Sequence, residues 1–250
     1  MNTYLPGYAA AYAWLARDIP ANLELLLGLL HEPLDELVVV GGAPHFTGVL
    51  MRGPHPTHRG ACFRLDAADD AALAALLAQQ RPQQRGFWLV HRPHLAAALH
   101  ARRTLRPTGM RLQGYARRTP TTHPCEGRAL APDDATLVAR SKVGWDALHF
   151  QRMFPYGRQP WAILRDDRIV CRAAVDVATP WSAEVIAVWT HPAYRNQGLA
   201  QRLVASVCNT ILQHHSLASY VTTNDNHASQ WVARKVGFAP VWEMEEFMDV

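Results

Sequence analysis

The chain has 250 residues, 49% of them hydrophobic and 18% charged, a composition typical of a globular protein with one large domain or two modest ones. The net charge is +4, but its arginine runs are short and lack interleaved aromatic residues, so we expect no nucleic-acid partner. No apolar run reaches membrane-spanning length, and Arg17 and Asp18 interrupt the region where a signal peptide would be apolar. We expect a cytoplasmic protein with no membrane partner.

The first half predicts a mixed succession of helices and strands and carries no recognisable motif. Asp69 and Asp70 stand at the start of an Ala/Leu-rich helix, where the helix dipole favours negative charge. Apolar periodicity predicts helices over 23–30, 69–80 and 94–103, and strands over 36–40, 47–51, 61–65, 87–90 and 110–115.

The segment 118–130 predicts a boundary. It contains Pro120, Pro124 and Gly127 and few periodic apolar residues, which indicates a linker. We therefore expect two domains, an N-terminal α/β domain over 1–120 and a C-terminal domain over 121–250. To the first we assign acceptor selection or the role of a lid.

The second half predicts a further mixed set of elements. A helix capped by Asp133 or Asp134 is expected to run through Leu137 to about Leu148. A hairpin with strands 161–164 and 169–177 is expected around the turn 166–168. Strands 183–190, 219–223 and 241–247 should alternate with one helix that begins near residue 199 and another around Trp231.

The segment 184–200 is the most informative of the chain. An apolar strand enters a short loop at Pro192 and then an Arg-x-x-Gly-x-Ala turn that opens a helix. The first turn of a helix presents unpaired N–H groups and the positive end of the dipole. Gly198 lets this backbone approach a bulky anion, and Arg195 adds a positive charge. The pattern predicts a pyrophosphate site.

Arg195, Gly198 and Ala200 resemble the (Gln/Arg)-x-x-Gly-x-(Gly/Ala) signature of the GNAT superfamily of acyl-CoA-dependent N-acyltransferases. A second block, 226–238, is similar to the family's Asn-x-x-(Ala/Ser) segment that ends in Lys-x-Gly-Phe. The resemblance covers roughly 130–250 and implies an α/β (α+β) GNAT fold with a mixed central sheet. It is closest to the glycine N-acyltransferase, FR47-like and ZmaR-like branches. In the architecture of the first two branches, the first half would be a degenerate GNAT-like domain.

The resemblance also implies acetyl-CoA or another acyl-CoA as co-substrate. Main-chain groups of the strand that ends at Thr190 would pair with pantetheine, and the following turn would hold the pyrophosphate. The residues expected to bind the acyl-CoA are Val188, Trp189, Thr190, Arg195, Asn196, Gln197, Gly198, Leu199, Ala200, Asn226 and Ser229.

Glu184 is the candidate general base, because the glycine N-acyltransferase branch has a glutamate in that role at the same distance before the arginine. A carboxylate can take the proton of an attacking amine directly or through water. A surface ion pair is the other interpretation of Glu184, and Asp176 and His191 are weaker candidates for the base. In an unbroken strand Glu184 would share a face with Ile186 and Val188, although a bulge would change that facing.

The last helix lacks the family's usual acid, because its tyrosine position is Ala233. Ser229 and Ala233 lie one turn apart and would offer pantetheine a small surface, while Trp231 and Val232 are expected to face the core. Ser229 could equally be an ordinary helix serine.

Cysteine and histidine spacing predicts no metal and no disulfide framework. The cysteines are scattered, and Cys208 fits a buried small hydrophobe. The pairs His55/His58, His91/His94 and His214/His215 lack a nearby carboxylate or thiol in sequence. We expect the aromatic residues Trp145, Phe150, Phe154, Tyr156 and Trp161 to belong to the core rather than to an acceptor pocket.

Two classes of function follow. The first is an acetyl-CoA-dependent N-acetyltransferase that transfers its acyl group directly to the primary amine of a small or amino-acid-like molecule. The second, suggested by Ala233, is a non-catalytic CoA-binding or sensory module. A protein or peptide acceptor and a homodimer are left open.

Overall fold

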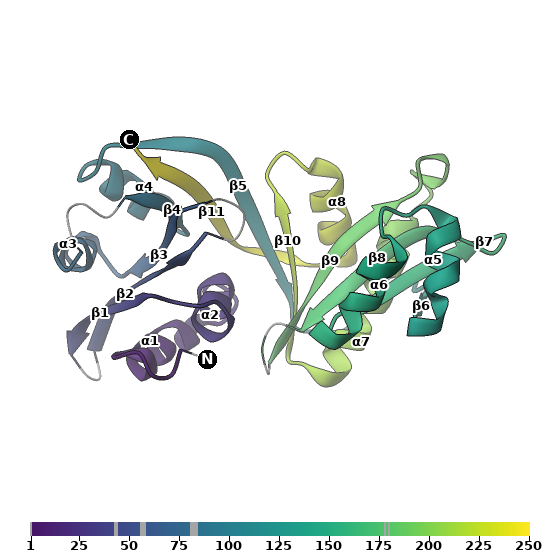
Figure 1. Ribbon diagram of the computed structural model, residues 1–250, viewed down its shortest axis with the longest axis horizontal. Coiled ribbons are helices and arrows are strands. Elements are labelled where there is room, and N and C mark those ends of the chain that lie inside the picture. Colours follow the sequence, from purple (N-terminus) through teal and green to yellow (C-terminus); the bar gives the residue numbers. More distant parts are fainter. Residues whose placement is uncertain (1, 43–44, 56–58, 81–84, 178, 180) are drawn as a thin grey trace. The chain divides into compact units, whose positions relative to one another are not determined.

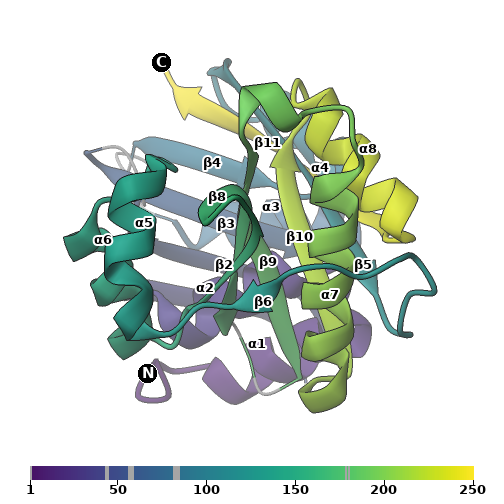
Figure 2. The same cartoon turned by 90° about the vertical axis from the view of Figure 1, so that its right-hand side faces the viewer.

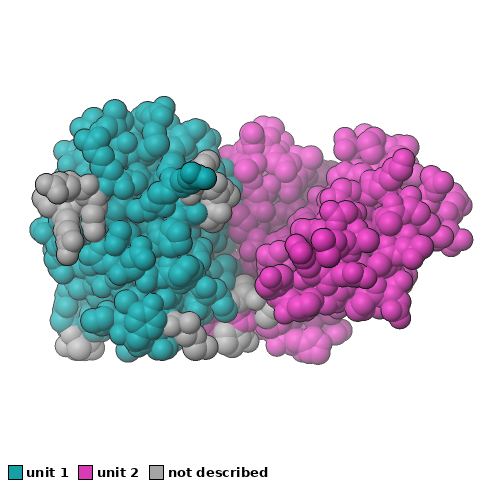
Figure 3. Space-filling view, viewed as in Figure 1, with its two compact units in different colours: residues 1–113, 241–250 teal, residues 114–240 magenta. Residues whose placement is uncertain are grey.

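The computed structural model describes residues 2–42, 45–55, 59–80, 85–177, 179 and 181–250. The chain has a mixed α/β fold that divides into two compact units (Figure 3). Unit 1 comprises residues 1–113 and 241–250, and unit 2 comprises residues 114–240. The predicted domain boundary at residue 120 stays a prediction, because compactness does not test independent folding. Within the described part of the chain, no helix is both long and apolar enough to cross a membrane.

Unit 2 is a sheet with the strand order β10-β9-β8-β7-β6. Strands β9 and β10 pair parallel, and β6 to β9 pair antiparallel. The strands are β6 (Arg128–Ala129), β7 (Gln159–Arg165), β8 (Arg168–Val177), β9 (Ser182–Thr190) and β10 (Leu217–Thr223). The helices are α5 (Ala135–Ser141), α6 (Ala147–Met153), α7 (Leu199–His214) and α8 (His227–Val236).

The helices of unit 2 lie on opposite faces of the sheet, α5 and α6 on one and α7 and α8 on the other (Figure 2). The helix predicted to begin near residue 199 is confirmed as α7, in which the apolar side chains of Leu203, Val204, Val207 and Ile211 are all buried. These side chains pack against strand residues such as Val185, which gives unit 2 its larger core cluster. Burial of these apolar side chains holds α7 against the sheet, with its first turn following the end of β9.

The predicted hairpin is confirmed, whereas the predicted long helix is wrong. Asp166 and Asp167 have φ of 47° and 55°, the left-handed pair that closes a two-residue hairpin between β7 and β8. The helix expected to extend to Leu148 is instead two helices, α5 and α6. Lys142 leaves α5 with φ 50°, and the Asp146 carboxylate accepts a hydrogen bond from the His149 amide (2.7 Å) and so starts α6.

The first half of the chain repeats the element order that follows β6 in the second half: two helices, three strands, then helix, strand, helix and strand (Figure 1). The helices of unit 1 are α1 (Tyr8–Leu15), α2 (Leu23–His31), α3 (Asp70–Ala78) and α4 (Pro93–His100). The strands are β1 (Glu36–Gly42), β2 (His45–Pro54), β3 (Ala61–Ala67), β4 (Gly86–Val90) and β5 (Leu105–Arg117), joined by β11 (Ala239–Asp249). Helix α1 was not predicted, because its eight residues are apolar on nearly every face of the helix and show little amphipathic periodicity.

The strand pairing of unit 1 matches that of unit 2, because β1, β2 and β3 are antiparallel and β3 pairs parallel with β4. Its order is β1-β2-β3-β4-β11-β5, with β11 antiparallel to β4 through Glu245–Met248. The chain's last strand thus completes the sheet of the first unit. In turn Gly114–Arg117, the end of β5, belong to unit 2, where β5 neighbours β10.

Candidate active site

Strands β9 and β10 separate partway along their length. Their pairing begins at Ser182 with Leu217 and ends at Val185 with Tyr220, although β9 continues to Thr190. All residues of both strands are described, so the edge of β9 that faces β10 has no strand partner beyond Val185. Such an edge carries main-chain donors and acceptors that an extended ligand can pair with. The predicted residues Val188, Trp189 and Thr190 lie on this stretch.

A β-bulge lies in the same stretch of β9. Ala187 has φ 55°, and the register with β8 shifts from Ala174↔Ile186 to Arg172↔Trp189. The bulge turns Val188 toward the α7/α8 core, whereas Ile186 packs toward α5 and α6. The strand is therefore not unbroken, and the bulge noted as the alternative from sequence places Val188 on the face opposite Ile186.

Arg172 on β8 holds this bulge, and no sequence motif singled it out. Its guanidinium donates hydrogen bonds to the carbonyls of Val143 and Ala187, each at 2.6 Å. It also lies over the Trp145 ring, 4.3 Å from the centroid. Burial lowers the Arg172 pKa to about 10, so the side chain still carries its charge at neutral pH.

We expect Arg172→Met to lower the free energy of unfolding by about 2–3 kcal/mol, because it removes two charge-assisted hydrogen bonds and leaves both carbonyls without this donor. Urea denaturation measures the change. Arg168→Met is the matched control, since Arg168 lies on the same strand and is exposed. Equal stability of the two variants would show that the two Arg172 hydrogen bonds do not stabilise the fold.

The turn into α7 has the geometry of an anion site. Gly198 is the N-cap of α7 with φ 72° and provides no side-chain cap, and Asn196 is also left-handed with φ 62°. The first helical N–H groups therefore lack a capping side chain. Arg195, Asn196 and Gln197 are exposed, and Arg195 Nε donates to the Thr190 carbonyl (3.2 Å), which ties the arginine to the end of β9. The structure brings Arg195 to Ala200 together with Thr190, as predicted.

One prediction for the second sequence block, residues 226–238, differs from the structure of helix α8. Trp231 is 54% exposed and lies beside Lys235, so its predicted place in the core is wrong, whereas Val232 is buried as predicted. The inward arc consists of Ser229, Val232, Ala233 and Val236, which helical periodicity places away from Trp231. Asn226 caps the helix by accepting a hydrogen bond from the Ser229 amide at 3.1 Å.

Ser229 has a partner that the sequence analysis did not consider. Its hydroxyl oxygen lies 2.7 Å from the phenolic oxygen of Tyr220, the β10 residue at which β9 and β10 separate. Burial raises the pKa of Tyr220, partly offset by the hydrogen bond with Ser229, and the Glu184 charge adds to the rise. A tyrosine in an apolar strand reads as core from sequence alone, so only the fold reveals this contact.

Glu184 is half-buried on β9, directly opposite Asp176 on β8. Of the two other candidates for the base, Asp176 accepts a hydrogen bond from Arg158 Nε (2.9 Å), and His191 Nδ1 accepts one from the Ala193 amide (3.2 Å). Glu184 lies in the last part of β9 that is paired on both sides, next to the separation of the strands. It is thus the carboxylate beside the opening.

The remaining predicted residues divide between core and surface. Cys208, Trp145 and Phe150 are buried, as expected, but Tyr156 is 76% exposed and not part of the core. The pair with His58 lies outside the described residues. His55 does have a carboxylate neighbour, Glu246 at 3.1 Å, which is far away in the sequence. Among the described residues, no group of three potential ligands is arranged for a metal.

The matching position in unit 1 is built differently. There the parallel pair β3/β4 runs over all of β4, from Ala61↔Gly86 to Leu65↔Val90, without separating. The start of α3 is filled by Asp69, whose carboxylate accepts a hydrogen bond from the Ala72 amide (2.8 Å). A negative side chain therefore occupies the place where unit 2 presents uncapped N–H groups.

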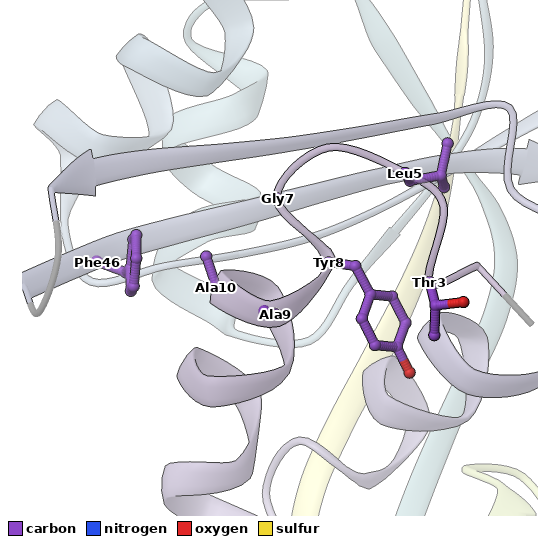
Figure 4. A pocket seen from close by; sticks show the side chains of 7 residues that line it. All are labelled: Thr3, Leu5, Gly7, Tyr8, Ala9, Ala10 and Phe46. Atoms are coloured by element: carbon purple, nitrogen blue, oxygen red, sulfur yellow. The ribbon is translucent and has the colours of Figure 1, made fainter.

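An open hollow in unit 1 offers no comparable chemistry (Figure 4). It lies beside α1, and its polar side chains are the hydroxyl groups of Thr3 and Tyr8. Its lining residues are Thr3, Leu5, Gly7, Tyr8, Ala9, Ala10 and Phe46. Because it presents no acid, base or cation, we place the candidate site in unit 2.

Comparison with known proteins agrees with this location. The profile described as "Acetyltransferase (GNAT) family" matches residues 131–238. No match was found among curated proteins. Of the solved structures, a GCN5-related N-acetyltransferase from Sphaerobacter thermophilus is 14% identical with a TM-score of 0.64, over 98% of this chain and 94% of that one. Another, from Kribbella flavida, is 18% identical with a TM-score of 0.58, over 92% and 95%.

These likenesses extend over both units, and at such identities they concern the fold alone. The profile match contains the candidate active site from β9 to α8, including both sequence blocks first noted at Arg195 and Asn226. The match to this family supports acyl-transfer activity in general, and the enzymes of the family use acyl-CoA as co-substrate. Residues 131–238 thus form a GNAT acetyltransferase domain.

Proposed function

We propose that the protein is an acetyl-CoA-dependent N-acetyltransferase that acts on the primary amine of a small or amino-acid-like molecule. The observation that carries the proposal is the separation of β9 and β10 after Tyr220, next to the uncapped start of α7. An extended pantetheine can pair with the free edge of β9, while the pyrophosphate takes the N–H groups at Gly198 to Ala200.

The reaction needs a base and a polarised thioester. Glu184 takes the proton of the amine as the nitrogen attacks the thioester carbonyl carbon, and the C–S bond breaks with its electron pair on sulfur. Main-chain N–H groups near the bulge at Ala187 are the donors available to the carbonyl oxygen as it gains charge. Transfer is direct, which agrees with the burial of Cys171 and Cys208, whose thiol pKa values burial raises to about 11 and about 12.

A non-catalytic CoA-binding module is the second candidate, because Ala233 replaces the expected acid and is fully buried in the core. A panel of amines and amino acids with acetyl-CoA, assayed by release of free thiol, separates the two candidates. We expect turnover with at least one amine. CoA binding without turnover across the panel would favour the sensory module, and absence of CoA binding would contradict both.

We expect one acetyl-CoA per chain, although the two halves of the chain share an element order. In unit 1 the Asp69 carboxylate occupies the start of α3, and β3 and β4 do not separate. A phosphate there would face a negative charge instead of free N–H groups. Isothermal titration should give a stoichiometry of one. A stoichiometry of two would contradict the assignment.

A further inference from the structure

The contact between Tyr220 and Ser229 lies at the end of the β9/β10 pairing. Ser229 precedes Ala233 by one turn of α8, and the tyrosine expected at Ala233 would have served the leaving group. Tyr220 is the last β10 residue paired with β9, so its hydrogen-bonded hydroxyl marks the mouth of the strand opening.

The direction of this hydrogen bond decides what Ser229 can do. A hydroxyl has one proton and can also accept. If the phenol donates to the serine oxygen at 2.7 Å, the serine proton is free to point elsewhere. Tyr220 is 2% exposed, and the burial that raises its pKa keeps the phenol protonated and able to donate above neutral pH.

We propose that Ser229 donates a hydrogen bond to the sulfur of the departing CoA thiolate and that Tyr220 is the positioning residue that orients it. This inference rests on the proposed N-acetyltransferase function. As the C–N bond forms and the C–S bond breaks, the electron pair stays on sulfur and the proton of the amine goes to Glu184. Ser229 transfers no proton; it stabilises the anion, and so replaces a tyrosine at position 233.

The first test measures the ionisation of CoA bound to the intact protein. Ultraviolet absorbance of the thiolate across pH gives the acid dissociation constant of the bound thiol. Ser229→Ala should lower that constant roughly 10- to 100-fold, the scale of one hydrogen bond to an ion, while Ser229→Thr, which retains a hydroxyl, should restore it. An unchanged constant in Ser229→Ala would overturn the proposal.

The second test uses steady-state kinetics with acetyl-CoA and the best amine. Ser229→Ala should lower kcat by roughly 10- to 100-fold with little change in the KM for acetyl-CoA. Tyr220→Phe should lower kcat less, and should have no further effect in the Ser229→Ala background, because its contribution passes through Ser229. Ser206→Ala, which removes a half-buried serine hydroxyl from α7, is the control and should retain the wild-type kcat.

The outcomes separate this inference from the proposed function. If wild-type protein binds no CoA or acylates no amine, the proposed function is wrong. If the wild type is active and Ser229→Ala keeps its kcat, or if the effects of Tyr220→Phe and Ser229→Ala simply multiply, the function stands and the thiolate role is wrong.

Discussion

Replacement of Gly198 with tryptophan should abolish measurable acetyl-CoA binding. Gly198 is the N-cap of α7, and a Cβ there would contact only the ends of Arg202 and Gln201, so the indole would extend over the N–H groups proposed to hold the pyrophosphate. A charge-assisted hydrogen bond contributes about 1.5–3 kcal/mol. Loss of about two such bonds to the pyrophosphate predicts a fall in acetyl-CoA affinity of roughly 100-fold or more. Isothermal titration calorimetry measures it.

The control for this prediction separates backbone strain from exclusion of the ligand. Gly157 has φ 75°, close to the 72° of Gly198, and an added Cβ there meets nothing within 4 Å. A side chain in the left-handed region costs roughly 1–2 kcal/mol at either glycine. Gly157→Trp should therefore lose similar stability and keep its affinity for acetyl-CoA. Unchanged acetyl-CoA affinity in Gly198→Trp would show that the pyrophosphate does not bind at this turn.

Replacement of Glu184 with glutamine should lower kcat by roughly 10²-fold or more at neutral pH, the usual scale of a general base. Acetyl-CoA affinity should be retained, because Glu184 lies in the doubly paired part of β9 and precedes the free edge. The defect should shrink as pH rises, since more of the acceptor amine is then neutral without a base. Steady-state kinetics across pH with the best acceptor measure both effects.

Asp176→Asn is the matched variant, because Asp176 lies directly opposite Glu184 on β8 and is bound to Arg158. We expect it to keep most of the wild-type kcat. If Asp176→Asn shows the large loss and Glu184→Gln does not, the base is Asp176. In wild type the rate should reach a plateau at high pH and not fall with an acid of ordinary pKa, because Ser229 does not titrate and burial raises the pKa of Tyr220.

Local signals were sufficient to predict most elements and to select the turn that we propose as the anion site. Apolar periodicity located α7, the hairpin of β7 and β8, and the strands other than β6, because these patterns report which side chains are buried within one element. The turn at Arg195 and Gly198 was predicted because its chemistry depends on backbone freedom and charge at adjacent positions. The family profile matches residues 131–238 and bears out the resemblance noted in the second half, whereas the anion site stays a prediction.

The contacts that complete the site join residues far apart in sequence, and so could not be predicted. Arg172 reaches Val143 and Ala187 only after β8, β9 and the segment before α6 are assembled, and Tyr220 meets Ser229 only through the packing of α8 on β10. The place of β11 in unit 1 is likewise a matter of strand partners, which periodicity does not report. The prediction for Trp231 was wrong because a large aromatic residue was expected to be buried, whereas its position on α8 faces outward.

A crystal structure of the protein with acetyl-CoA tests the central claim most directly. We expect one acetyl-CoA per chain, with pantetheine paired to the edge of β9 beyond Val185 and the pyrophosphate on the N–H groups of Gly198 to Ala200. The thioester should then lie beside Glu184 and Ser229. Acetyl-CoA bound at the start of α3, or at a site that leaves the opening between β9 and β10 empty, would contradict the account.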